Sequence, residues 1–155
     1  MPFIEEKIKE RAKLGRRPTF LHGPAPAGGG ARYRAVGSGD QGRKWRAYYT
    51  LNPEELLSMD ASCRHQGWRP DVLAPHEYKS QLRFMLVTVD NHDRVDWRFR
   101  MDMSLKEYQA ESAEQKRQGL FPLALSSYRD KAGARYAAIW VRYRVVAPPG
   151  RAAGK

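Results

Sequence analysis

The sequence predicts an α+β fold built from tandem strand-helix-strand-strand units, which form antiparallel sheet with helices packed on one side. The main observation is a period of 52 residues, because residues 97–140 repeat the landmarks of the segment before them. The paired landmarks are Trp97 with Trp45, Gly119 with Gly67, Pro122 with Pro70, Leu125 with Leu73, Tyr136 with Phe84 and Ile139 with Val87. A period of this size is typical of an array of supersecondary units, in which adjacent copies pack together to bury their sheets.

The first copy, residues 1–36, is partial and holds a helix and two strands. Apolar residues recur at helical spacing over residues 3–14, and Gly15 is placed to end that helix. An extended run begins at Pro18, and a second strand is expected at 32–36. No strand precedes this helix, so the first copy has an incomplete edge for upstream sequence or another chain to fill.

The second copy, residues 45–89, follows a Gly-rich connector at 37–44. The aromatic run at 45–51 predicts a strand. Asn52 or Thr50, followed by Pro53 and two glutamates, predicts the start of a helix that runs to about Gln66 and stops at Gly67. Strands are expected near 70–74 and at 82–89.

The third copy, residues 97–143, shows the plan most clearly. Apolar and charged residues alternate over 97–103, which predicts a half-buried strand. Ser104 with Glu107 predicts a capping box at the start of a helix that Gly119 ends. Strands are expected at 122–126 and 134–143, and residues 147–155 read as a disordered basic tail.

Composition sets limits on the class of protein. The chain has 155 residues, with 28 Lys and Arg against 17 Asp and Glu, a net charge of +11. Such a charge attracts nucleic acid, anionic membrane surfaces or acidic proteins. The basic residues are dispersed along the chain, however, which favours a soluble, Arg-rich surface with no dedicated partner. No apolar run is long enough for a transmembrane segment. The lack of a secretion signal and the single cysteine, Cys63, favour a cytoplasmic location.

Three motifs of the third copy resemble a known family. They are GLFP at 119–122, LSSY at 125–128 and RYAAIW at 135–140. Their combination resembles the bacterial tandem repeat unit also found in polyglycine hydrolases, where it accompanies a beta-lactamase-like serine hydrolase domain. The resemblance implies an α+β repeat scaffold that acts as an accessory module on hydrolases or serine/threonine protein kinases. It carries over no catalytic residue.

No catalytic, metal or cofactor set emerges from the sequence. No serine is followed three residues later by lysine, and the catalytic loop and metal motif of protein kinases are absent. Residues 37–42 match the G-x-G-x-x-G pattern, but they lie between two predicted strands and not before a helix, so we interpret them as a connector. The spacing of Cys63, His65, His76 and His92 fits no short zinc pattern, and we expect them to be incidental.

The candidate binding surface consists of arginines that recur beside aromatic residues. Its members are Arg32, Arg46, Arg83, Arg98 and Arg135. Rows of Arg and aromatic side chains across a curved sheet are typical of proteins that bind single-stranded nucleic acid. The structural alternative is that the aromatics face the core and the arginine stems cover the sheet, and strand alternation favours it.

The sequence therefore predicts a non-catalytic repeat module that recognises a protein or polymer for a larger enzyme, such as a hydrolase or protein kinase. The alternative is a basic nucleic-acid-binding module that uses the Arg and aromatic rows. A free-standing enzyme ranks last, since no acid, base, nucleophile or metal set supports it.

Overall fold

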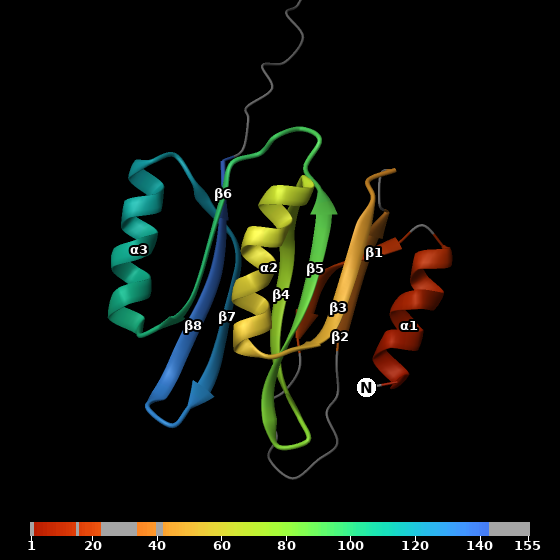
Figure 1. Cartoon of the computed structure of the whole chain (residues 1–155), viewed down its shortest axis with the longest axis horizontal. Coiled ribbons are helices and arrows are strands. Elements are labelled where there is room, and N and C mark those ends of the chain that lie inside the picture. The colour runs from red at the N-terminus through yellow and green to blue at the C-terminus, as the bar shows by residue number, and fades with distance from the viewer. Residues whose placement is uncertain (1, 15, 23–33, 40–41, 143–155) are drawn as a thin grey trace, which may run out of the picture.

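The fold consists of three successive units, each with its own antiparallel sheet (Figure 1). The computed structural model describes residues 2–14, 16–22, 34–39 and 42–142. Unit 1 consists of α1 (Pro2–Lys13), β1 (Arg16–His22) and β2 (Arg34–Gly39). Unit 2 consists of β3 (Trp45–Leu51), α2 (Pro53–Gln66), β4 (Trp68–Tyr78) and β5 (Gln81–Asp90). Unit 3 consists of β6 (Trp97–Met103), α3 (Leu105–Arg117), β7 (Phe121–Asp130) and β8 (Gly133–Val141).

Units 2 and 3 have the same strand order. The third strand of each unit lies at the centre of its sheet, so the orders are β3-β5-β4 and β6-β8-β7, and every pair is antiparallel. In unit 1 the described residues form a sheet of two strands, β1 and β2. The predicted order of strand, helix, strand, strand and the antiparallel pairing are confirmed in units 2 and 3. The sheets are separate, one to a unit.

Local signals at the helix ends act as the sequence predicts. Asn52 caps α2 and Ser104 caps α3, and each forms a reciprocal capping box with the glutamate three residues later. The chain leaves α2 through Gly67, whose φ of 71° is readily adopted by glycine. Gly119, with a φ of 77°, has the same role after α3. No helix in the described ranges is long and apolar enough to cross a membrane.

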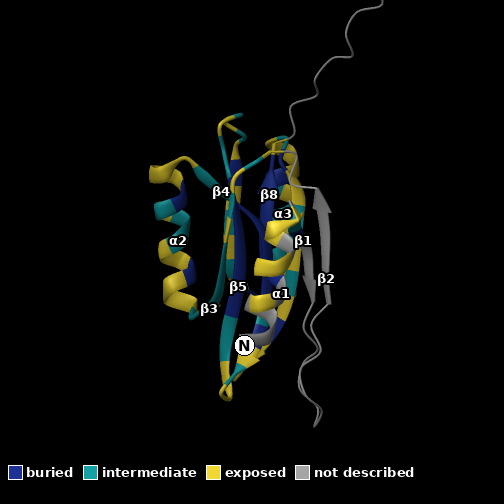
Figure 2. Cartoon of the chain, turned by 90° about the vertical axis from the view of Figure 1, so that its right-hand side faces the viewer, coloured by how far each residue is buried: buried dark blue, intermediate teal, exposed yellow. Residues whose placement is uncertain are grey.

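Two faces can be defined on each three-stranded sheet by the central strand. The even face of unit 2 carries Phe84 and Leu86, and its odd face carries Met85 and Val87. In unit 3 the even-numbered residues of β8 define the even face in the same way. Buried residues concentrate on β5 and β8 in Figure 2, whereas the helices are exposed on their outer sides. Both central strands are therefore covered on both faces.

In the described ranges the buried side chains form three clusters, and two of these connect neighbouring units. Ile8 of α1 packs on the odd face of unit 2. Leu56 and Cys63 of α2 share a cluster with the even face of unit 2 and with odd-face residues of unit 3, such as Ile139. Tyr108 of α3 packs against Trp140 and the rest of the even face of unit 3. The core is thus shared between units, since the sheets of units 2 and 3 are buried partly by residues from the unit beside them.

The junction between units 2 and 3 is made by β4 and β7, which lie side by side. The hydroxyl of Ser126 on β7 donates a hydrogen bond to the carbonyl oxygen of Leu73 on β4, at 2.7 Å. Tyr128 packs edge-on against Phe84, with 5.3 Å between ring centroids. Phe84 and Leu73 are consequently almost fully buried.

The junction between units 1 and 2 has the same layout, because β1 lies beside β4. Here the contact is ionic: Arg17 of β1 and Arg69 of β4 both pair with Asp71, whose side chain is 9% exposed. The distance from Arg69 Nη1 to Asp71 Oδ1 is 3.1 Å. In unit 3 the position equivalent to Asp71 is occupied by Leu123, so this pair is specific to the first junction.

The strand bounds differ from the prediction in several places. β2 continues to Gly39, so residues 37–39, which the sequence assigned to the connector, belong to a strand. β4 and β7 are longer than the runs predicted at 70–74 and 122–126, because each hairpin extends to its turn. Gly15, the end of the predicted strand at 134–143 and the tail at 147–155 lie outside the described residues.

Candidate binding surface

Arg46 lies near the start of β3 and covers an aromatic ring of its own unit. It pairs with Thr88 of β5, which places it on the even face of unit 2. Its guanidinium carbon is 4.1 Å from the ring centroid of Trp68, and its Nη1 donates a hydrogen bond to Gln66 at 3.3 Å. The residue is exposed, so this cation–π contact is open to solvent on its outer side.

Arg98 occupies the equivalent position in unit 3. It pairs with Trp140 of β8, on the even face, and its side chain is exposed. Its Nη1 donates a long hydrogen bond, 3.5 Å, to the carbonyl oxygen of Trp97. No carboxylate in the described part of the chain forms a salt bridge with Arg46 or Arg98. The two arginines therefore present positive charge at matching places in successive units.

Arg83 and Arg135 form a second equivalent pair, on β5 and β8. Both lie at odd positions of the central strands, and hence on the odd faces. Arg83 donates hydrogen bonds to the carbonyl oxygen of Leu82, at 3.0 Å, and to the side chain of Gln81. Arg135 Nε lies 2.9 Å from Asp130 and 3.4 Å from Asp102. The hydrogen bond with Asp130 raises the pKa of Arg135, so its charge is already paired.

The structure therefore divides the predicted surface into two pairs. Thr88, opposite Arg46, is five residues from Arg83 along β5, a separation of about 17 Å at the usual rise per strand residue. The two positions also face opposite sides of the sheet. The same holds for Arg98 and Arg135 in unit 3. Arg32 lies outside the described residues.

The aromatic side chains beside these arginines are mostly in the core. Trp97 is 3% exposed, and Arg64 of α2 covers its ring with the guanidinium carbon 3.8 Å from the ring centroid. Phe84 is fully buried at the junction with unit 3. Tyr136 stacks on Tyr108, with 5.8 Å between ring centroids. The rings at 84 and 97 are thus inaccessible to nucleic-acid bases.

The four residues weighed as a zinc set are separated by the fold. Cys63 and His65 lie on α2, with Cys63 buried and His65 exposed; His76 is buried on β4, and His92 lies in the exposed loop before β6. Within the described ranges, no three His, Cys, Asp or Glu side chains are grouped so that they could hold a metal ion.

The G-x-G-x-x-G pattern has no helix behind it. Residues 37–39 belong to β2, residues 40 and 41 are outside the description, and Gly42 is followed by β3. A dinucleotide site of this type needs the N-terminus of a helix to meet the pyrophosphate. The pattern therefore has no helix N-terminus to complete it.

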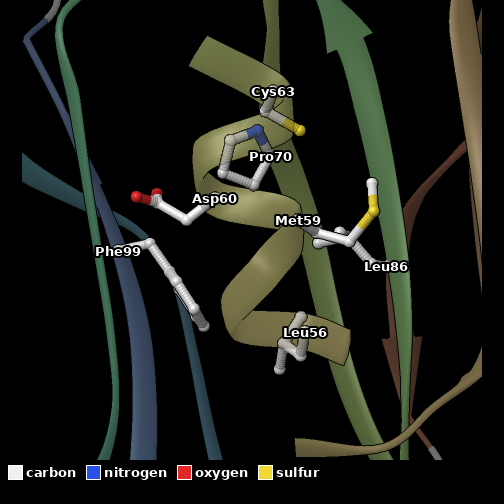
Figure 3. A pocket seen from close by; sticks show the side chains of 7 residues that line it. All are labelled: Leu56, Met59, Asp60, Cys63, Pro70, Leu86 and Phe99. Carbon is white, nitrogen blue, oxygen red and sulfur yellow. The ribbon is translucent and has the colours of Figure 1, made fainter. Parts of the chain in front are cut away.

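A small apolar cavity lies where α2, the sheet of unit 2 and β6 meet (Figure 3). Its lining residues are Leu56, Met59, Asp60, Cys63, Pro70, Leu86 and Phe99. Its volume is about 10 Å³, near the minimum needed for a single water molecule. The cavity is a packing gap between units and too small for a substrate.

Cys63 is expected to be chemically inert in the folded protein. Burial, with a smaller contribution from Asp60, raises the pKa of its thiol to about 11. Because the thiolate is the nucleophile, the neutral thiol at pH 8 reacts slowly with alkylating or disulfide reagents. We expect no labelling by a thiol-reactive dye at pH 8 under native conditions and full labelling after unfolding in denaturant. Rapid native labelling would show that the junction between units opens readily.

Sequence reasoning missed two sets of residues with a role in unit contacts. One is the ionic group of Arg17, Arg69 and Asp71, for which the signal was an aspartate within the otherwise apolar run at 70–74. The other is the role of Arg64, which bonds to Trp97 across the junction, with Nη2 donating to its carbonyl oxygen at 3.3 Å. Its place in the last turn of a helix predicts helix-dipole complementation and not a contact with another unit.

Comparison with known families connects this architecture to one of them. The family described as polyglycine hydrolase-like, structural repeat, matches the chain twice, at residues 42–87 and 94–143. These two matches correspond to units 2 and 3. No curated protein and no solved structure shows significant similarity to the chain. On these two matches, which together span more than half of its length, the chain belongs to the polyglycine hydrolase-like structural repeat family.

Proposed function

We propose that the chain is a non-catalytic repeat module that recognises a protein or polymer as an accessory part of a larger enzyme, such as a hydrolase or a protein kinase. The observation that carries this proposal is the core shared between units, in which α2 packs with residues of two sheets. Such a core gives an extended rigid scaffold, and repeat scaffolds of this kind act through their surfaces.

The arrangement of each unit supports the same proposal. We take the scaffold to be α+β, with the helix of each unit laid on one face of its own sheet. The contacts of α2 with β4 and β5, and of α3 with β7 and β8, support this arrangement. Stacking then leaves the sheet edges and the outer sides of the helices available to a partner.

A second candidate function is nucleic-acid binding, and one observation favours it. Arg46 and Arg98 repeat at matching positions without a carboxylate partner in the described residues, in a chain of net charge +11. Charged side chains at regular spacing suit a phosphate backbone. Base stacking is not part of this candidate, because Trp97 and Phe84 are buried.

Titrations followed by tryptophan fluorescence separate the two functions. The probes are a glycine-rich peptide and a random single-stranded oligonucleotide, each at low and near-physiological salt. For a protein-recognition module we expect peptide binding that persists at the higher salt, with the peptide intact by mass spectrometry. Oligonucleotide binding should then disappear at the higher salt, since only screened charge attraction sustains it.

Two double variants with the same change in charge serve as matched probes of the arginines. If nucleic acid is the true partner, Arg46→Ala with Arg98→Ala should reduce the salt slope of oligonucleotide binding by about 1.4, which is two phosphate contacts to a single strand. Arg83→Ala with Arg135→Ala, which removes the two arginines of the odd faces, should leave it unchanged. Peptide cleavage by the purified chain would contradict the non-catalytic reading, and salt-resistant oligonucleotide binding would reverse the order of the two candidates.

A further inference from the structure

The even face of unit 3 has an apolar surface that is buried at the equivalent place in unit 2. This terminal face consists of Pro122, Leu125 and Ser127 of β7 and Tyr136 of β8. Leu125 is 50% exposed, whereas its equivalent Leu73 is 3% exposed. Pro122 is exposed where Pro70 is buried, and Tyr136 is partly exposed where Phe84 is fully buried. Apart from Ser127, which stands where unit 2 has Pro75, these residues match in kind, so the difference in their burial arises from what covers them.

What covers the face in unit 2 is the next unit. Ser126 and Tyr128 of β7 lie over β4 and β5, where Ser126 donates to the carbonyl oxygen of Leu73 and Tyr128 packs on Phe84. In unit 3 the part of the even face near α3 is sealed, since Met103, Leu120 and Trp140 are at most 3% exposed. The part along β7 has no such cover among the described residues.

The stacking rule is the same at both junctions. β4 lies beside β1, and β7 lies beside β4. By this rule, a further strand of the β1, β4 and β7 series is expected to lie on the terminal face. Within the described part of the chain, β1 is the strand of this type with no earlier unit beside it, and its sheet has two strands where the others have three. Among the described residues, β1 and β7 are thus the two strands of this type with a described neighbour of the series on one side alone, and these uncovered sides are complementary.

We propose that the terminal face docks the first unit of a second copy of this chain, so that chains associate head to tail with β7 of one beside β1 of the next. The contact continues an interface that already exists twice within the chain. It is heterologous, because different surfaces meet, and such contacts add further copies without closing at a dimer. The net charge of +11 opposes association, and added salt weakens this repulsion.

The test is sedimentation velocity of the full chain over a range of concentrations, with nucleic acid excluded by its absorbance. We expect the average mass to rise above the monomer value of 17.8 kDa and past that of a dimer, and to rise further with salt. A monomer at every concentration, or a mass that stops at a dimer, would overturn the proposal. Either result leaves the recognition function untouched, because that function is tested by peptide binding.

Two variants assign the contact to the terminal face. Leu125→Asp should shift self-association to at least tenfold higher concentration. Leu57→Asp is the matched control, since Leu57 is 54% exposed on α2 and outside the terminal face. It should associate like the unmodified chain. Should Leu125→Asp fold poorly by circular dichroism, Ser127→Arg places a charged side chain on the same face at an already exposed position. Association by the terminal-face variant equal to that of the control would refute the assignment.

Discussion

Replacing Leu73 by alanine is expected to destabilise the fold by about 2–5 kcal/mol, whereas the same replacement at Leu125 should cost roughly 0.5 kcal/mol. The two residues occupy equivalent positions on β4 and β7. Leu73 is 3% exposed beneath unit 3, and Leu125 is 50% exposed. The larger cost arises from lost apolar burial and from the cavity that the shortened side chain leaves in the junction.

Thermal unfolding followed by circular dichroism measures this contrast. At about 3 °C per kcal/mol for a chain of this size, Leu73→Ala should lower Tm by roughly 5–15 °C and Leu125→Ala by about 2 °C or less. Hydrogen exchange adds a spatial test: in Leu73→Ala, amides of both β4 and β7 should lose protection, because the residue joins two units. Equal effects of the two substitutions would show that the units do not stabilise each other.

The unit plan was predictable from the sequence because its signals are local or periodic. Asn52 and Ser104 act within one helical turn, and the 52-residue shift pairs Leu73 with Leu125 without any knowledge of the fold. The resemblance to the family rested on motifs at 119–140, and the family match includes them. These features do not depend on how units meet in space.

The candidate surface was less predictable, because it depends on strand register and on contacts between units. Arg46 follows Trp45, and Arg83 precedes Phe84. The register of β3 on β5 nevertheless places the two arginines near opposite ends of the sheet and on opposite faces. Arg135 of β8 pairs with Asp130, beside the β7–β8 turn, and with Asp102 of β6. Sequence spacing alone does not carry such information.

The ionic contact at the first junction shows how one unit is held to the next by charge. Asp71 is 9% exposed and pairs with Arg17, 19% exposed, and Arg69, 12% exposed. The Nε atoms of both arginines are buried without a hydrogen-bond partner among the residues that the structure describes. The Asp71 carboxylate is therefore the main group that offsets the cost of partly burying the guanidinium groups of Arg17 and Arg69.

Asp71→Asn is accordingly expected to cost about 2–4 kcal/mol, somewhat less than removal of one partner from a fully buried pair, since both guanidiniums retain some solvent. The loss should be local first: hydrogen exchange in β1 should accelerate strongly, while β7 and β8 change little. Asp60→Asn is the matched control, because its pair with Arg64 is about a third exposed and is expected to contribute at most about 0.5 kcal/mol.

A double-mutant cycle measures the interaction free energy between Arg17 and Asp71 separately from the effect of each substitution alone. Arg17→Met removes one cation while keeping the length of the side chain, so in the Arg17→Met background Asp71→Asn should be milder by about 1 kcal/mol or more. A strictly additive double variant would mean that the Arg17–Asp71 pair does not stabilise the junction, and that β1 is held there by packing. A positive coupling would instead show that the charged group at Asp71, where unit 3 has Leu123, ties the first unit, in which the structure describes two strands, to the rest of the array.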